Sequence, residues 1–169
     1  VWILVAAAVA AVCGWSADFD VLIRNGRVVD GTGNGWYRAD VGIAQGKIVA
    51  VGQLAGKSAG SVIDAKGRVV APGFIDVHTH IEGAIEKVPR GDNYLLDGVT
   101  TVVTGNCGSS EVKMGEWFAE LEKSGIGLNV AALIGHNSVR QEVMGSENRK
   151  ATDEEIAKIH RRRVTLRAG

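Results

Sequence analysis

The segment 18–71 alternates short apolar runs with turn-forming dipeptides. These dipeptides, 25–26, 45–46 and 66–67, each end in glycine and follow one another at close spacing. Asn25-Gly26 is a strong hairpin signal, because both central residues of a type I′ turn need positive φ. Strands this short, with turns this close, predict a small antiparallel β unit.

The pattern changes at Pro72-Gly73, after which longer apolar and β-branched runs alternate with polar stretches. Three runs, 74–77, 99–104 and 129–134, have the composition of buried strands. Their spacing leaves room for a helix between one strand and the next.

Helical signals separate and follow these runs. Residues 114–124 place apolar side chains at helical spacing, and Gly125 is suited to cap that helix. Residues 152–155 form a capping box, so another helix is expected to start there. The alternation predicts parallel strands joined by crossover helices. Either a barrel or a doubly wound sheet is compatible with it.

Metal-ligating side chains follow two of the predicted strands. His78 and His80 are two residues apart, so in an extended chain they point to the same side and can share one cation. Cys107 follows the next strand, and adjacent parallel strands bring their ends together. A histidine pair alone also fits an ordinary loop, and an unpaired cysteine is often a small buried side chain. The flanking glycines favour an exposed, ligating Cys107.

The charge balance and the first 17 residues bear on possible partners and on localisation. Lys and Arg number 19, as do Asp and Glu, so no basic footprint for nucleic acid is expected, although the end of the chain is rich in arginine. Residues 1–17 carry no charge and resemble the apolar core of a secretory signal peptide. A retained membrane anchor is the alternative. We expect an exported protein, periplasmic or secreted, that contacts a membrane only if this segment is kept.

Several motifs together resemble one family. APGFIDVHTH at 71–80 resembles the signature of the amidohydrolase superfamily, and VTTVVTGNCG at 99–108 is similar to a second-strand motif of its N-acyl-D-amino-acid deacylase (D-aminoacylase) branch. NVAALIGHNSVR at 129–140 resembles the third-strand region of that branch. DVLIRNGRVVDGTG at 20–33 resembles the small β domain that precedes the barrel. The motifs together cover about residues 18–160.

The resemblance implies an α/β fold with a small β-sandwich part at 18–71. The first three β/α units of an incomplete TIM-like (β/α)8 barrel are expected at 72–169. It implies that His78, His80 and Cys107 bind Zn2+, with one or two ions in the intact family enzyme.

The resemblance also assigns other side chains. His136 and Arg140 are expected to line the substrate pocket, with a structural histidine as the alternative, and Asp76 is expected to form a structural hydrogen bond. The family places its remaining histidines and its general-base aspartate on later strands, so no catalytic set is complete in this chain. Because the sequence departs from the family after Ile159, we expect a truncated or frameshifted end. An ordinary basic helix end is the alternative.

The implied activity is hydrolysis of a linear amide C–N bond in a small-molecule substrate, an N-acyl-D-amino acid, by a metal-dependent hydrolase. The chain alone is expected to be inactive. A cyclic amidase of the dihydroorotase or hydantoinase type is one alternative, disfavoured by Cys107 where such enzymes have a bridging lysine. A non-catalytic metal-binding remnant is another. The acyl group, the amino-acid side chain and the oligomeric state are not determined by these motifs.

Overall fold

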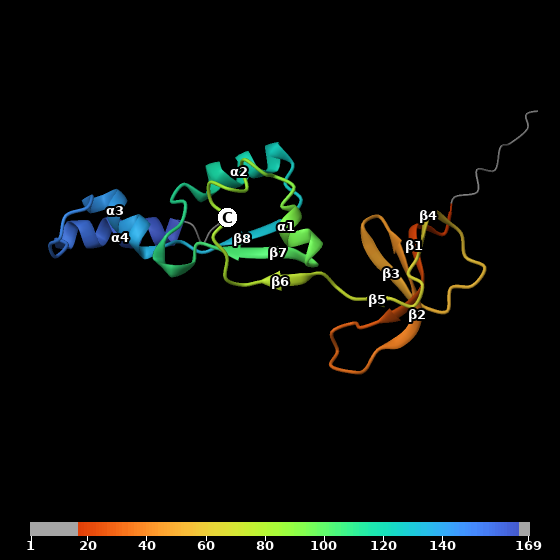
Figure 1. Cartoon of the computed structure of the whole chain (residues 1–169). Helices are drawn as coiled ribbons and strands as arrows, with labels where there is room; N and C mark the ends of the chain where they lie inside the picture. The colour runs from red at the N-terminus through yellow and green to blue at the C-terminus, as the bar shows by residue number, and fades with distance from the viewer. Residues whose placement is uncertain (1–16, 166–169) are drawn as a thin grey trace, which may run out of the picture. The chain divides into compact units, whose positions relative to one another are not determined.

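The computed structural model describes the backbone of residues 17–165 and side chains as far as residue 161. The chain divides into two compact units between Pro72 and Gly73, which are described separately below (Figure 1). Nearly all of the expected leader lies outside the described residues. Within residues 17–165, no helix is both long enough and apolar enough to cross a membrane.

The first unit is a five-stranded mixed sheet (Figure 1). The strands are β1 (Phe19–Val28), β2 (Tyr37–Ala44), β3 (Lys47–Gly52), β4 (Ala59–Asp64) and β5 (Val69–Val70). Their order is β3-β2-β1-β4, and β5 also pairs with β1. The β1–β2 and β2–β3 pairs are antiparallel, as predicted, but β4 and β5 both run parallel to β1. The prediction of a wholly antiparallel unit is therefore wrong. The strands described in this unit form one sheet. A sandwich needs two sheets, so the expected sandwich is not seen among the described residues.

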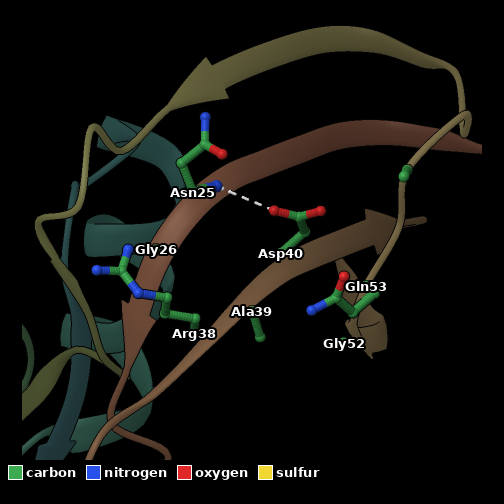
Figure 2. Close-up of a pocket in the computed structure, with 8 residues that line it drawn as sticks. Asn25, Gly26, Arg38, Ala39, Asp40, Gly52 and Gln53 are labelled. Carbon is green, nitrogen blue, oxygen red and sulfur yellow. Dashed lines mark hydrogen bonds between the residues drawn. The ribbon is translucent and has the colours of Figure 1, made fainter.

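The hairpin predicted at Asn25-Gly26 is also wrong. Strand β1 continues through this dipeptide, with a register shift between Ile23 and Gly26 and a positive φ of 58° at Asn25. A register shift with a positive φ is typical of a β-bulge. The backbone N–H of Asn25 donates to the carboxylate of Asp40 on β2 at 2.9 Å (Figure 2). This interaction gives the bulged backbone a partner, so the strand bends without reversing.

The other two turn signals have different outcomes. Gln45 and Gly46 both have positive φ and join β2 to β3, which confirms that hairpin. Lys66 and Gly67 also have positive φ, but they lie beside the β1 bulge, where the Gly67 N–H donates to the Asn25 carbonyl at 2.8 Å. The chain then continues in the same direction as β5. Strands β4 and β5 thus behave as one parallel partner of β1, interrupted opposite the bulge.

The second unit contains a three-stranded parallel sheet of order β6-β7-β8, which confirms the predicted parallel strands. Its elements are β6 (Phe74–Asp76), α1 (Asp92–Leu96), β7 (Val99–Thr104), the 3₁₀ turn η1 (Asn106–Gly108), α2 (Met114–Ser124), β8 (Asn129–Ala132), α3 (His136–Met144) and α4 (Asp153–Thr165). The β8 strand is shorter than predicted.

Helix α2 begins and ends where its sequence signals lie, and helix α4 begins at its predicted capping box. Helix α2 buries Trp117 and Leu121 and ends at Gly125, whose φ of 71° is left-handed. At the start of α4, the Thr152 N–H donates to the Glu155 carboxylate at 2.8 Å and the Glu155 N–H donates to the Thr152 hydroxyl at 3.3 Å. This is the reciprocal pair of a capping box. Both predictions are confirmed.

Helix α3 was not predicted. It is nine residues long and buries only Val139 and Met144, so its apolar stripe is too short to stand out in the sequence. Those two side chains pack with Ile159 of α4, and the two helices lie side by side (Figure 1). The partner helix therefore stabilises a segment whose own pattern is weak.

The main core of the second unit lies between the sheet and α2. Val102, at the centre of β7, is fully buried, and it clusters with Trp117 and Leu121 of α2. Ile81 and Ile85, in the segment after β6, belong to the same cluster. That segment is further held by a hydrogen bond from the Trp117 indole N–H to the carboxylate of Glu86. The core thus anchors the chain just after the histidine pair, and the pairing of β6 with β7 holds it just before the pair.

Candidate metal centre

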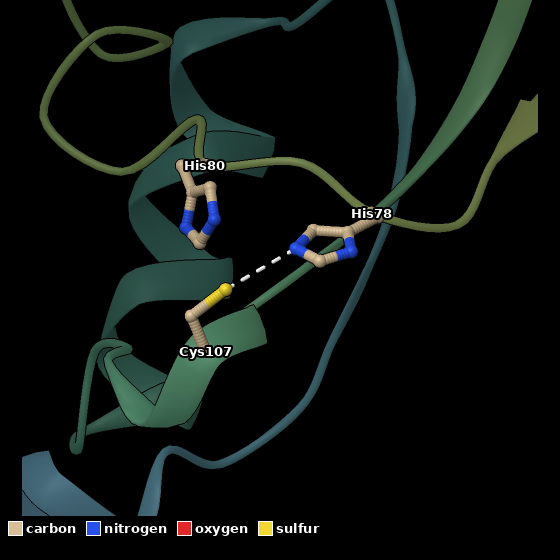
Figure 3. A group of neighbouring side chains, drawn as sticks. All are labelled: His78, His80 and Cys107. Carbon is tan, nitrogen blue, oxygen red and sulfur yellow. Dashed lines mark hydrogen bonds between the residues drawn. The ribbon is translucent and has the colours of Figure 1, made fainter.

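The three predicted metal ligands lie together at one edge of the parallel sheet. Strand β6 ends at Asp76 and β7 ends at Thr104, and the two strands are direct parallel neighbours. Histidines 78 and 80 follow the first strand, and Cys107 follows the second. One ligand atom from each of these three side chains lies within 4.8 Å of the others. Figure 3 shows the three side chains pointing toward one another.

The distances suit a single tetrahedral ion. The His78 Nε2 and Cys107 Sγ atoms are 3.3 Å apart, and the two imidazole rings have their centroids 5.6 Å apart at an interplanar angle of 65°. Zn–N and Zn–S bonds of about 2.0 and 2.3 Å at a tetrahedral angle place two ligand atoms about 3.5 Å apart. The present spacing therefore needs only small side-chain movements to accept an ion. Two imidazoles and a thiolate are also a donor set that zinc prefers.

The histidine pair is oriented by the residue between its members. Thr79 is only 4% exposed, whereas His78 and His80 are exposed on the opposite side of the segment. The backbone N–H of His78 donates to the Asp76 carboxylate at 3.1 Å. This contact confirms the expected structural hydrogen bond of Asp76.

A tight loop brings Cys107 to the histidines. Cys107 has a positive φ of 58° and is exposed, so the alternative of a small buried side chain is wrong. The loop packs closely against the end of β8. A Cβ at Gly105 would lie 1.9 Å from the Leu133 carbonyl oxygen, and a Cβ at Gly135 would lie 2.4 Å from the Gly108 carbonyl oxygen. Glycine at both positions permits this close backbone approach.

His136 and Arg140 are not part of this cluster within the described residues. His136 is the first residue of α3 and is exposed. The Arg140 guanidinium donates to the carbonyls of Glu147 and Arg149 at 2.8 and 3.1 Å. Arg140 thus has a structural role in closing the loop after α3, and the substrate-binding role of both residues stays a prediction.

A hollow of about 330 Å³ adjoins the cluster through His80. Its other lining residues come from the segment after β6 and from α1 and are mostly apolar: Ile81, Ala84, Ile85, Val88, Gly91, Asn93 and Tyr94. A second hollow, of about 320 Å³, lies in the first unit beside Asp40 and Arg38 (Figure 2). The Asp40 carboxylate there already accepts two backbone N–H groups, those of Asn25 and Leu54.

The resolved pKa shifts belong to hydrogen-bonded groups and ion pairs away from the cluster. The pKa of Glu155 is lowered to about 2, chiefly by hydrogen bonds from the Arg149 guanidinium and then by the Thr152 N–H. In the first unit, hydrogen bonds from the Lys57 ammonium and from Ser58 hold the pKa of Asp18 well below its usual range. These charges stabilise α4 and the β1–β4 edge respectively.

The sequence reasoning missed the polar side chains that support the ligands. Thr79 and Asn106 are adjacent to ligands in the sequence and bond to the Val103 carbonyl. Thr104, three residues before Cys107, bonds to the Thr79 carbonyl. A hydroxyl-bearing residue between two histidines is a signal that could have indicated Thr79, whereas Thr104 and Asn106 have no comparable signal in the sequence.

Comparison with known proteins finds a D-aminoacylase and an N-acyl-D-aspartate deacylase among the relatives of this chain. The chain is 37% identical over 165 residues to a D-aminoacylase of Alcaligenes xylosoxydans xylosoxydans, covering 84% of this chain and 34% of that protein. It is 34% identical over 164 residues to an N-acyl-D-aspartate deacylase of the same organism, covering 83% and 33%. The chain thus spans about a third of the length of these curated relatives.

A solved structure matches as well. The N-acyl-D-glutamate deacylase of Bordetella bronchiseptica, in complex with zinc and a phosphonate inhibitor, has a TM-score of 0.78 and 33% sequence identity. The match covers 85% of this chain and 35% of that one. The model of the family described as "Amidohydrolase family" matches residues 61–168, which is well over half of the sequence. The chain therefore belongs to the amidohydrolase family.

Proposed function

We propose that this chain supplies the metal-binding part of a hydrolase that cleaves the linear amide bond of N-acyl-D-amino acids. The observation that carries the proposal is the convergence of His78, His80 and Cys107 from two adjacent parallel strands. The similarity to three deacylases of N-acyl-D-amino acids supports the substrate class. In this proposal the parallel β/α segment is the start of a TIM-like barrel.

The proposed cofactor is Zn2+, held by the two imidazoles and the thiolate. When bound, the ion supplies Lewis acidity that polarises a carbonyl and makes water more nucleophilic. The residues of this chain hold the ion and fix its position at the carboxyl edge of the sheet, where α/β enzymes build their sites. The exposed side chains leave that edge accessible to a small substrate.

The metal site is tested by zinc analysis of the purified 169-residue chain. We expect one equivalent of zinc in the wild type and a large loss in His78→Ala, His80→Ala and Cys107→Ser. The chain has four histidines, so His136→Ala and His160→Ala, which lie outside the cluster, are matched controls. Equal zinc content in the wild type and the three cluster variants would reject the site.

The 169-residue chain alone is expected to show no turnover of N-acetyl-D-methionine with added zinc. Within the described residues no carboxylate joins the cluster, so no general base is in place there. General acid–base help is typically worth about 10²–10⁴-fold. Turnover that disappears in Cys107→Ala would contradict this expectation.

The ability of this chain's metal site to support deacylation is tested in a chimera that joins this chain to the remaining two thirds of the D-aminoacylase. We expect hydrolysis of N-acetyl-D-methionine in preference to the L enantiomer and to a 5-substituted hydantoin, and loss of activity in Cys107→Ser. A zinc-loaded chimera that opens the hydantoin and leaves the N-acyl-D-amino acid intact would instead support a cyclic amidase.

We also propose export of the protein, on the ground of the uncharged residues 1–17 alone. Fractionation of the native host, with N-terminal sequencing of the recovered protein, tests this. Recovery from the cytoplasm with residues 1–17 intact would contradict it.

A further inference from the structure

The main-chain carbonyl of Val103 links the two segments that carry the metal ligands. It accepts the backbone N–H of Thr79 at 3.0 Å and the Thr79 hydroxyl at 2.9 Å. It also accepts the side-chain amide of Asn106 at 3.0 Å. Thr79 lies between His78 and His80, and Asn106 immediately precedes Cys107. One carbonyl oxygen therefore ties the histidine segment to the cysteine loop.

The Thr104 hydroxyl makes a second link between the strands. It donates to the Thr79 carbonyl at 3.1 Å and accepts the N–H of Ile81 at 3.3 Å. The backbone groups on both sides of His80 are thus bound to a single side chain of β7. Thr104 is fully buried, so water does not compete for these bonds.

These contacts extend the pairing of β6 and β7 beyond the regular ladder. Strand β6 ends at Asp76, and its last ladder partner is Val102. The next residues of the chain carry the histidines and need a fixed backbone to present both rings to one point. The Thr79 and Thr104 hydroxyls and the Asn106 amide supply hydrogen bonds to this backbone beyond the ladder. These side chains are neutral, so they add no charge near the proposed cation.

We propose that Thr79, Thr104 and Asn106 are positioning residues that hold the His78–His80–Cys107 set in its metal-binding geometry before an ion arrives. The proposal rests on the proposed metal site and adds the residues that determine its affinity and shape. Groups that hydrogen-bond to the ligand side chains typically change metal affinity about 10–100-fold when they are removed, and the lower end of that range is expected for side chains that hold the ligand-bearing backbone. We therefore expect Thr104→Val and Asn106→Ala to weaken metal binding about tenfold or more.

Cobalt(II) is the probe, because its visible and near-ultraviolet bands report affinity, coordination geometry and the thiolate ligand in one titration. The 169-residue wild type is compared with Cys107→Ser, Thr104→Val, Asn106→Ala and the pair Thr79→Val and Thr79→Ser. The matched control is Thr101→Val, because Thr101 is on the same strand and, among the described residues, its hydroxyl forms only a 3.5 Å contact with the Asn129 side-chain amide. Circular dichroism confirms that each variant is folded. If Thr104→Val unfolds the chain, Asn106→Ala, at a partly exposed position, decides the test.

Weaker binding and altered bands in Thr104→Val and Asn106→Ala, with Thr101→Val unchanged, would support the proposal. Thr79→Ser should keep the wild-type spectrum, because it retains the hydroxyl that Thr79→Val loses. Wild-type affinity and bands in all folded Thr79, Thr104 and Asn106 variants would overturn it while leaving the metal site intact. No thiolate band in the wild type, or an equal band in Cys107→Ser, would overturn the metal site and this proposal together.

Discussion

Gly105→Ala is expected to destabilise the second unit because two separate costs meet at this position. The φ of Gly105 is 77°, and a new Cβ would lie 1.9 Å from the Leu133 carbonyl oxygen. The left-handed conformation alone costs about 1–2 kcal/mol for a residue with a Cβ. Relieving the overlap moves the loop away from the end of β8, and overpacking typically costs a further ~1–3 kcal/mol.

Gly125→Ala separates the two costs. Gly125 has a similar φ of 71°, but a Cβ there would meet nothing within 4 Å. It should lose about 1 kcal/mol, after the smaller unfolded-state entropy of alanine offsets part of the strain. We expect Gly105→Ala to lose about 3 kcal/mol in all, which is the strain plus the overlap.

The assay is urea denaturation of both variants, followed by circular dichroism, with cobalt titration of the folded proteins. Gly105→Ala should also weaken cobalt binding, because the displaced loop carries Cys107, whereas Gly125→Ala should leave it unchanged. If Gly105→Ala is no less stable than Gly125→Ala, the close approach of the loop to Leu133 is refuted as the reason for glycine at this position.

Three further predictions address metal, pH and packing. A free zinc concentration of about 100 times Kd should stabilise the folded chain by about 2.7 kcal/mol in thermal or urea unfolding, and Cys107→Ser should abolish this gain. The pKa of Glu155 falls on folding, so its ion pair with Arg149 stabilises the chain above pH 4.5, and this contribution is lost as the pH falls to about 2. Glu155→Gln should flatten that part of the pH–stability curve, with Glu154→Gln as the control, and equal curves would argue against the ion pair. Leu121→Ala, at a side chain that is 2% exposed, should cost about 2–5 kcal/mol in urea denaturation, and a loss below 1 kcal/mol would contradict the packing of α2 on the sheet.

Patterns within a few neighbouring residues were sufficient to predict the helices and strands whose formation depends on propensity and capping. Helix α2 was predicted from the spacing of its apolar residues and from Gly125, and the start of α4 from the Thr152–Glu155 capping box. The strands of the parallel sheet were predicted from apolar runs and, at 99–104, from a β-branched run. In each case a few neighbouring residues contain the pattern, because propensity and capping act within one or two turns.

Contacts between distant segments decided the rest. Asn25-Gly26 has the sequence of a hairpin turn but forms a bulge, because Asp40 binds the Asn25 N–H and the chain at residues 64–70 runs alongside it. Helix α3 depends on its packing against Ile159, which its own short stripe does not reveal.

The candidate site divides in the same way. The sequence by itself determined the ligand types and the side of the segment on which His78 and His80 lie, since alternation along an extended chain follows from backbone geometry. The meeting with Cys107 was predicted on the condition that the two strands are neighbours, and the tertiary structure met that condition. Only the tertiary structure decided that the Val103 carbonyl links both segments. Hydrogen bonds between strands separated by more than twenty residues depend on register, and register is determined by the packing of the whole sheet.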